Sequence, residues 1–465
     1  MSKQVSDAMN TNERRAMSGL SLVFAFRMLG MFMVLPVLAT YGQELEGATP
    51  LLIGLAIGAY GLTQAVLQIP FGMLSDRIGR LPVIYTGLLI FALGRAVAAL
   101  ASSIEMVIVG RVLQGAGAIS AAVMALLSDL TREQNRTKVM AAIGMSIGLS
   151  FVVAMVLGPL LTRYFGLSGL FWFTALMALV GIVIMAVWIP KPEHQLQHLD
   201  SGINLKRFWS LVRHGQLLRL DVGIFVLHAL LMASFMALPL ALVEQGGLAR
   251  DEHWWVYLIA MGVGFFAMLP FIIYSEKKRQ IKKVFLGAIA VVVLSQLYFL
   301  WLGTNLTLLI VGAVIFFAAF NLLEATLPSL ISKISPVGAK GTAMGIYSTS
   351  QFLGASVGGI FGGWLFQLAG TSAVFLGCAL LATLWLVFAA TMQEPPYVTS
   401  TRLEVESAPP LTDEWLKQLR TQTGVMDALY VAEEAAVYVK FDGKHIERAQ
   451  LEQLLASIIS AGQSK

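Results

Sequence analysis

Long runs of apolar residues recur along the chain, separated by short polar segments. A helix needs about 20 such residues to cross the hydrocarbon core of a bilayer, whereas barrel strands show alternating stretches of about ten. Only helices and closed barrels satisfy every backbone polar group inside a membrane. We therefore predict membrane-spanning helices at residues 17–41, 51–73, 82–102, 104–128, 138–164, 168–189, 219–243, 253–275, 282–302, 304–330, 341–367 and 372–392.

Lysine and arginine gather in every second connection between these runs. The basic connections are the N-terminal segment and residues 74–81, 129–138, 190–218, 277–283 and 331–340. The intervening loops carry only Arg163 and Arg250, together with acids such as Glu44 and Glu105. Because cytoplasmic loops carry the excess of basic residues, the alternation supports twelve spans and predicts that both termini are cytoplasmic.

The composition agrees with a chain that is solvated partly by lipid. Of the 465 residues, 57% are hydrophobic and only 13% are charged, whereas soluble domains carry about 25% charged residues. The single cysteine, Cys378, excludes a disulfide within the chain and a thiolate metal cluster. The first apolar run lacks a small-residue cleavage pattern, so we interpret it as a retained helix.

Two segments of the chain are repeated at nearly the same offset. PFGMLSDRIGR, from Pro70, matches PFIIYSEKKRQ, from Pro270, and the segment from Leu127 matches the one from Pro328. Such a duplication predicts two pseudo-symmetric six-helix bundles with a binding site between them at mid-membrane. We place them at residues 1–189 and 219–393. The linker 190–218 is predicted to hold a helix on the membrane surface, the alternative being an irregular basic linker.

The composition changes after Gln393, and alternating patterns replace long apolar runs. Residues 394–465 predict the order strand, helix, two strands, helix, which favours a small α+β domain with a ferredoxin-like fold. The pattern resembles heavy-metal-associated domains, but residues 407–411 contain no cysteine, so no thiolate metal site is expected. The interpretations left are a regulatory or interaction role, with an unknown ligand or protein, and a passive appendage.

The connection between the second and third predicted helices holds the most specific motif. Gly72, Asp76, Arg77, Gly79 and Arg80 form a Gly-x-x-x-Asp-Arg-x-Gly-Arg pattern that resembles the signature loop of the major facilitator superfamily. The resemblance implies a latch that holds the outward-facing state by contact with the N-terminus of helix 11. Asp129, at the cytoplasmic end of helix 4, is a natural partner for one of the arginines. The alternative is ordinary topology-setting charge.

Arginines inside the predicted spans should face the bundle interior, because a charged side chain at mid-membrane costs at least about 2.5–3.5 kcal/mol. Arg111 and Gln114 resemble the family's Arg-x-x-Gln-Gly motif, which implies a role in proton transfer; pairing with a backbone carbonyl is the alternative. Arg27, near the middle of helix 1, is predicted to line the cavity. Arg95, in helix 3, is expected to snorkel outward.

The second half supplies the candidate proton-coupling residues. Glu324 is the most membrane-embedded acid, and with Asn321, one turn before it, is predicted to line the second half of the cavity. Burial favours the protonated form of a carboxyl group, which suits proton coupling; a carboxylate held by an internal arginine is the alternative. His228 in helix 7 is a second candidate, although a lone histidine is often a packing residue.

Helix 5 carries spaced small residues that end in Gly-Pro. Gly144, Gly148, Gly158 and Pro159 partly resemble the family's antiporter signature, while Ala154 and Thr162 occupy positions of two of its glycines. Small residues of this kind permit close helix packing. The departures weaken the implication of antiport but not that of transport.

Taken with the resemblance, these features predict a secondary active transporter in the inner membrane of a bacterial cell, which exports a small molecule by alternating access and is driven by the proton gradient. The expected partners are the substrate, protons and the lipid bilayer, with no nucleic acid and no cofactor. The alternatives are a solute importer or uniporter of the same fold, and a membrane sensor that signals through its C-terminal domain. No Walker A motif, nucleophile–base constellation or metal-ligand spacing supports an ATP-driven pump or an enzyme.

Overall fold

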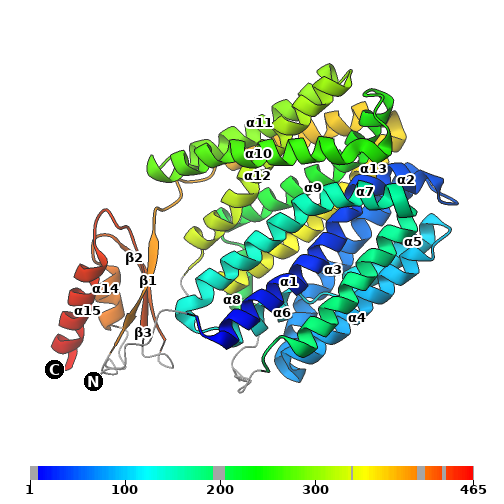
Figure 1. Cartoon of the computed structure of the whole chain (residues 1–465). Coiled ribbons are helices and arrows are strands. Elements are labelled where there is room, and N and C mark those ends of the chain that lie inside the picture. The colour runs from blue at the N-terminus through cyan, green and yellow to red at the C-terminus, as the bar shows by residue number, and fades with distance from the viewer. Residues whose placement is uncertain (1–8, 192–204, 337–338, 406–413, 432–435, 464–465) are drawn as a thin grey trace.

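The computed structural model describes residues 9–191, 205–336, 339–405, 414–431 and 436–463. Helices dominate the chain up to Ala390, and a small mixed α/β domain follows (Figure 1). The helices of the first half are α1 (Thr11–Met33), α2 (Leu35–Tyr41), α3 (Pro50–Ile78), α4 (Arg80–Ala99), α5 (Ile104–Ala116), α6 (Ser120–Asp129) and α7 (Glu133–Val187). Those that follow are α8 (Leu205–Val212), α9 (Gly215–Glu244), α10 (His253–Lys277), α11 (Ile281–Leu302), α12 (Leu306–Ile334) and α13 (Lys340–Ala390).

Ten helices of the described chain are long and apolar enough to cross a membrane, and two of them are far longer than one crossing requires. The 55 residues of α7 and the 51 residues of α13 would each extend beyond about 75 Å as one straight helix. Gly166 interrupts α7 and Ala369–Gly370 interrupt α13 with non-helical backbone angles. Since the hydrocarbon core is about 30 Å thick, each long helix provides two crossings, which reconciles ten helices with the twelve predicted runs.

Two other crossings are broken rather than merged. The first crossing changes from α1 to α2 at Val34, because Pro36 lacks the N–H that a continuous helix needs. The fourth crossing divides into α5 and α6 at residues 117–119. The break leaves carbonyl oxygens without helical partners in the interior of the first half. The predicted linker helix is present as α8, and residues 192–204 of the linker lie outside the described residues.

The two halves meet closely at one end of the membrane core and lie apart at the other. We call the end that carries Arg163 and Arg250 the far end, and the end that carries Arg80 and the C-terminal domain the domain end. At the far end, glycines of α3 approach the backbone of α13: a Cβ atom at Gly54 would collide with the Gly359 carbonyl oxygen. At the domain end, the contacts of Arg80 with Asp129, of Arg132 with Glu13 and of Lys333 with Glu276 each stay within one half.

The C-terminal domain has the predicted order of elements. They are β1 (Thr399–Glu404), α14 (Glu414–Arg420), β2 (Val425–Val431), β3 (Ala436–Phe441) and α15 (Arg448–Gln463). The sheet has the order β1-β3-β2, and both strand pairs are antiparallel. The core of the domain includes Leu403, Trp415, Leu419, Val439 and Leu451. This core is separate from the one that the membrane helices share.

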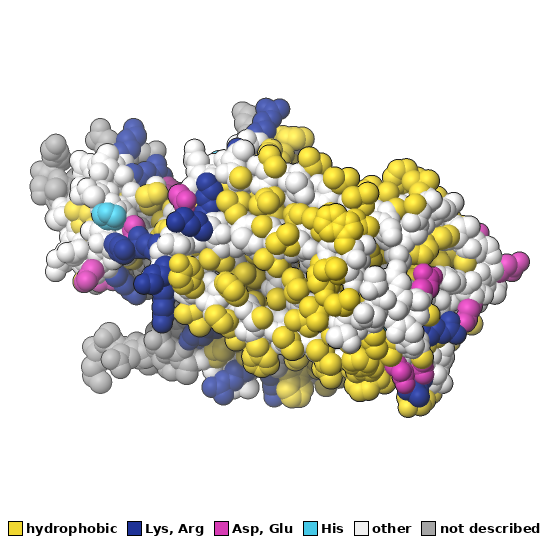
Figure 2. Space-filling view, turned by 90° about the horizontal axis from the view of Figure 1, so that it is seen from above, with side chains coloured by type: hydrophobic (Ala, Val, Ile, Leu, Met, Phe, Trp, Pro, Cys, Tyr) yellow, Lys and Arg dark blue, Asp and Glu magenta, His cyan; other side chains and the backbone are white. Residues whose placement is uncertain are grey.

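The surface of the molecule is zoned along its long axis. Figure 2 shows hydrophobic side chains over the middle of the core, lysines and arginines gathered toward the C-terminal domain, and most acidic side chains of the core at the opposite end. Exposed residues in the apolar zone include Leu176, Phe266 and Leu384. A surface so rich in large apolar side chains requires a lipid environment.

Candidate functional site

Glu324 forms the centre of a polar cluster inside the second half. Its Oε1 atom accepts a hydrogen bond from Gln351 Nε2 at 3.2 Å, and the same Nε2 atom lies 2.8 Å from His228 Nε2. His228 Nδ1 lies 3.9 Å from Glu324 Oε2. The side chain of Glu324 is 38% exposed, whereas that of His228 is 8% exposed. α9, α12 and α13 therefore bring a carboxylate, an imidazole and an amide together beside an accessible space.

The contacts limit how protons can be arranged in this cluster. Which atom donates between Gln351 Nε2 and His228 Nε2 depends on the imidazole tautomer, and the neutral tautomer that accepts from the amide carries its proton on Nδ1. That proton is then on the side of Glu324 Oε2, an atom without another partner among the described residues. No arginine among the described residues contacts this carboxylate. The structure therefore does not support the alternative of a carboxylate held by an internal arginine.

Aromatic rings lie on the far-end side of this cluster and join the two halves. Phe320 precedes Glu324 by one turn on α12, and its ring centroid lies 6.0 Å from that of His228 and 6.1 Å from that of Phe151 on α7. Phe151 packs in turn against Phe32 of α1 at 4.8 Å. These rings lie between Glu324 and the far end, whereas Cβ atoms at Gly148 and Gly345, on the domain-end side, would meet nothing within 4 Å.

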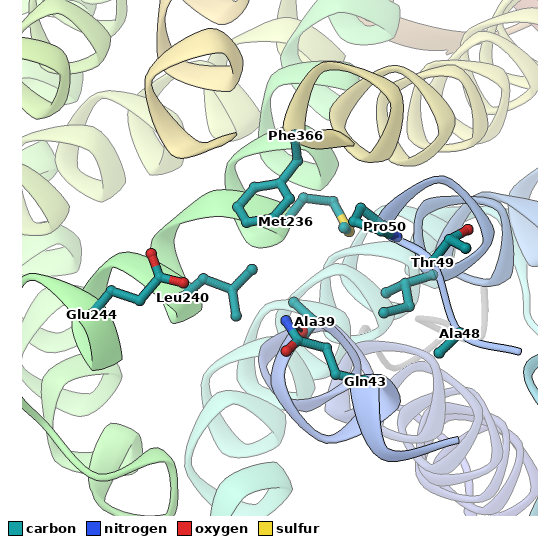
Figure 3. A pocket seen from close by; sticks show the side chains of 10 residues that line it. Ala39, Gln43, Ala48, Thr49, Pro50, Met236, Leu240, Glu244 and Phe366 are labelled. Atoms are coloured by element: carbon teal, nitrogen blue, oxygen red, sulfur yellow. Dashed lines mark hydrogen bonds between the residues drawn. The ribbon is translucent and has the colours of Figure 1, made fainter. Parts of the chain in front are cut away.

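Ion pairs close the far end between the halves. Arg250 Nη2 lies 2.5 Å from Glu44 Oε1, and Arg163 Nε lies 3.2 Å from Asp251 Oδ2. Both pairs join residues of opposite halves. A pocket remains between the halves at this end, lined by side chains that include Gln43, Met236 and Glu244 (Figure 3). It lies beyond the aromatic barrier and does not include Glu324.

Arg27 is buried within the first half, although the sequence predicts that it lines the cavity. It is 2% exposed and donates to Ser120 Oγ at 2.7 Å, to Gln64 Oε1 at 2.5 Å and to the Gly117 carbonyl oxygen at 3.0 Å. The Gly117 carbonyl is one that the break between α5 and α6 leaves without a helical partner. Arg27 therefore shares this carbonyl oxygen with the N–H of Ile119, which donates to it at 2.9 Å, and connects α1 to the break.

Arg111 and Gln114 also bond inside the first half. Arg111 donates to the carbonyl oxygens of Ala56 and Ile57 at 3.1 and 3.4 Å, and to Gln114 Oε1 at 3.1 Å. Gln114 Nε2 donates to the Gly94 carbonyl oxygen at 3.2 Å. The alternative of pairing with backbone carbonyls thus describes the observed geometry, while the role in proton transfer stays a prediction.

Arg95 corrects one expectation. The sequence predicts that it snorkels outward, but it is 0% exposed. It donates to the Gly30 carbonyl oxygen and lies over the rings of Phe91 and Phe171, at 4.9 and 5.7 Å. The face of α4 that carries Arg95 packs against α7, so the guanidinium finds acceptors and ring faces inside the protein rather than at the interface.

The signature loop forms a charge cluster within the first half. Arg80 pairs with Asp76, donates to Ser75 Oγ at 2.8 Å and lies 3.4 Å from Asp129 Oδ2. Gly79, between α3 and α4, has a φ of 98°, which favours glycine. Gly72 offers its carbonyl oxygen to Ser75 at 2.7 Å, and Arg77 is exposed.

The predicted latch involves the N-terminus of helix 11, which is the beginning of α13. A Cβ atom at Gly341, the second residue of α13, would meet no other residue within 4 Å. The space beside this glycine is therefore open here, and the latch stays a prediction for the opposite conformation.

The predicted packing glycines of helix 5 differ from one another. A Cβ atom at Gly158 would come within 2.6 Å of the Met33 carbonyl oxygen, so this glycine, next to Pro159, permits close approach of α1 and α7. Gly144 and Gly148 would meet nothing within 4 Å. Close packing at those two positions is therefore a prediction that this conformation does not fulfil, because this stretch of α7 has no neighbour next to its glycines.

Three polar residues near the cluster escaped the sequence analysis. Gln351 and Tyr347 lie one turn apart in a long apolar stretch of α13, and uncharged polar residues in such a stretch are the signal that identifies them. Asp221 is 7% exposed and lies close to the beginning of a predicted span, where a charged residue is ordinary and gives no signal in the sequence. Asn321, by contrast, was predicted to line the cavity and is half-buried on α12.

Comparison with known proteins gives consistent matches along the chain. The model of the Major Facilitator Superfamily matches residues 20–321 and 220–432. The inner membrane transport protein YajR of Escherichia coli (strain K12) is 51% identical over 447 residues, which cover 96% of this chain and 98% of that protein. The multidrug resistance protein MdtH of Yersinia enterocolitica is 24% identical over 348 residues, or 74% of this chain and 84% of MdtH.

A solved structure shares the architecture at low sequence identity. A point mutant of the nucleoside transporter NupG superposes with a TM-score of 0.66 at 14% identity, over 81% of this chain and all of that one. At this identity the likeness concerns the fold alone. The YajR match is different in kind, because it extends through the C-terminal domain as well as the membrane core.

Proposed function

The chain belongs to the Major Facilitator Superfamily, and we propose that this secondary transporter exports a small molecule in exchange for protons. The family is one of transporters rather than enzymes, and the relative YajR is an inner membrane transport protein. We assign this chain, too, to the inner membrane as a multi-pass protein. The alternation of basic loops supports an orientation with both termini, and therefore the domain end, in the cytoplasm.

The observation that carries the proposal is the position of Glu324. It is an acid within a membrane-spanning helix, its contacts are with His228 and Gln351 rather than with an arginine or lysine, and its side chain is 38% exposed. A carboxyl group in this setting can exchange its proton with the accessible space while the rings of Phe320 and Phe151 separate it from the far end. A cation that occupies the same space would compete with the proton for the carboxylate.

The observed conformation fits one state of an alternating-access cycle between the halves 1–189 and 219–393. The ion pairs of Arg250 and Arg163 close the far end, and the space beside Gly341, at the beginning of α13, is open. We propose that closure at the domain end brings Asp76 to the N-terminus of α13, where the helix dipole favours an anion. We also propose that the C-terminal domain is ferredoxin-like, since its sheet order β1-β3-β2 fits that fold.

The test follows the pH inside proteoliposomes under an imposed proton gradient, while lipophilic cations and small organic anions are added in turn. We expect substrate-triggered proton movement with the wild type and none with Glu324→Gln. The control is Glu252→Gln, which removes an exposed acid at the far end and should leave proton movement unchanged. Proton movement that survives Glu324→Gln would refute the assignment of Glu324. Absence of proton movement in the folded wild type, with any compound, would refute proton coupling.

A further inference from the structure

The loop between α10 and α11 matches the signature loop in position but differs from it in length and charge: Gly79 alone separates α3 from α4, whereas residues 278–280 separate α10 from α11. Ser75 Oγ donates to the Gly72 carbonyl oxygen at 2.7 Å, and Ser275 Oγ, at an offset of 200, donates to the Ile272 carbonyl oxygen at 2.8 Å. The positive φ of Gly79, 98°, recurs as 51° at Arg279. Each half therefore has a residue with a positive φ at the matching position, although the second loop is longer and Gln280, not an arginine, matches Arg80.

The second half lacks the acid that completes the cluster in the first half. There, Asp129 at the end of α6 lies 3.4 Å from Arg80. The repeat that matches Leu127 to Pro328 matches Asp129 to Leu330, which is 0% exposed in the core. No carboxylate on α12 is thus available at the equivalent position.

Arg279 occupies its position at a cost in backbone energy. It is the only residue other than glycine with a positive φ in the described chain. Glycine adopts such a conformation without the steric penalty that a Cβ atom brings. A larger side chain at this point indicates that the side chain itself is needed.

The side chain of Arg279 reaches an acid in the C-terminal domain. Its Nη1 and Nη2 atoms donate to Asp442 Oδ2 and Oδ1 at 3.0 and 2.8 Å, a two-point contact between planar groups. The guanidinium also lies 5.1 Å from the ring centre of Tyr397, in the segment that leads into β1. The hydrogen bonds from Arg279 hold the pKa of Asp442 well below its usual range, so the carboxyl group is ionised at neutral pH.

A second contact joins β3 to the end of α12. Lys440 is only 4% exposed and donates through Nζ to the carbonyl oxygens of Ser332 and Lys333 at 3.1 and 3.2 Å, and to that of Ser335. These carbonyls belong to the C-terminal end of the helix, where no helical N–H remains to pair with them and where a cation is favoured. The domain thus caps α12 with the residue two positions before Asp442.

We propose that the C-terminal domain is a built-in docking partner of the second half, in which Asp442 supplies the carboxylate that α12 lacks at Leu330 and Lys440 caps α12. The surface it occupies consists of Arg279 and the carbonyl groups of residues 332–335. Tyr397 extends the contact, since its hydroxyl oxygen accepts a hydrogen bond from the first N–H of α11, that of Ile281, at 3.0 Å. The domain end of Figure 1 shows the sheet beside the core in this arrangement.

Acetylation of lysine side chains in the full-length protein tests the docking, with each site followed by mass spectrometry. Lys444 is exposed on the same domain and serves as the internal reference for Lys440. In the wild type we expect Lys440 to react at least about tenfold more slowly than Lys444, since its amine is covered. Asp442→Asn keeps an oxygen for the local turn but removes the charge, and should raise the relative rate of Lys440 roughly fivefold.

Two further variants separate docking from other effects. Glu447→Gln removes an exposed acid from the same domain and should leave Lys440 protected. Arg279→Gly should release Lys440 as Asp442→Asn does, yet leave the melting temperature of the membrane core unchanged or higher, because glycine suits a φ of 51°. Lys440 as reactive as Lys444 in the wild type, or still protected in both docking variants, would overturn the proposal.

Discussion

Arg111 shows how a charged side chain is accommodated inside the first half. It is 1% exposed, and its guanidinium nitrogens donate hydrogen bonds to oxygen atoms of Ala56, Ile57 and Gln114. Its guanidinium carbon also lies 5.0 Å from the ring centre of Tyr60. Only a planar group with several N–H donors in a fixed arrangement reaches all of these partners together.

We predict that Arg111→Lys destabilises the protein even though it keeps the positive charge. Lysine has one ammonium nitrogen and cannot reach all of these acceptors, so some buried oxygens lose their hydrogen bonds. Each unpaired buried acceptor costs roughly 1–3 kcal/mol. The measurement is the melting temperature in detergent, with Arg77→Lys, an exposed arginine, as the matched control. An Arg111→Lys protein that melts like the wild type but moves no protons would instead support the proton-transfer role that the family resemblance implies.

The sequence identified which residues are unusual for a membrane span but not which partners they contact. Arg27 and Glu324 both stand out as charges in apolar runs, yet one is buried against Gln64 and Ser120 and the other faces an accessible space. The difference depends on helix rotation and on a helix break near Gly117. Hydrophobic periodicity indicates how a helix is rotated about its axis only where one face is polar. These spans are apolar on every side, so the partners of the two charges could not be predicted.

At the scale of elements, α3 and α13 form the tightest contact between the halves. Backbone approaches backbone at Gly54, Gly58 and Gly61, where a Cβ atom would collide with carbonyl oxygens of α13. The positions of the spans were predictable because their length is set by the bilayer. The breaks within the spans were less predictable. Pro36 indicates the break between α1 and α2, whereas residues 117–119, at the break between α5 and α6, contain no proline. The reversals at Gly166 and Gly370 agree with the predicted boundaries between spans.

We predict that Gly54→Ala shifts the protein away from the state with a closed far end. The added methyl group would collide with the Gly359 carbonyl oxygen only while α3 and α13 are in contact. Spin labels on cysteines at Gln43 and Glu244, in a Cys378→Ser background, report the distance across the far end, which should increase. Gly144→Ala, where a Cβ atom meets nothing within 4 Å, is the control. An unchanged distance in Gly54→Ala would contradict the role assigned to this contact.

At the scale of the whole molecule, the sequence predicts the architecture through duplication and composition. The membership of the superfamily, inferred from the signature loop, is confirmed by the family match. The predicted elements of the C-terminal domain are present, because alternating patterns and turn residues specify a short sheet locally. Its place on the core was not predictable, since the Arg279–Asp442 contact joins residues 163 positions apart without any local signal.

The last prediction concerns what the C-terminal domain contributes to transport. We expect a chain that ends before residue 394 to move protons and substrate, because Glu324, His228 and Gln351 all lie in the membrane core and make no contact with the domain. The carbonyl groups that Lys440 caps would then bind water at the domain end, which costs little in an exposed position. Proteoliposomes that contain the truncated and full-length proteins provide the measurement, with Glu324→Gln in each as the inactive reference.

The outcome distinguishes a transporter from a sensor. A membrane sensor must pass its signal through the domain, so its output would disappear with residues 394–465, whereas a transporter retains solute movement at a changed or unchanged rate. If docking on the second half restrains the rocking of the halves, Asp442→Asn should change the rate in the same direction as the truncation. Opposite effects would show that the domain acts on transport by a route other than Arg279.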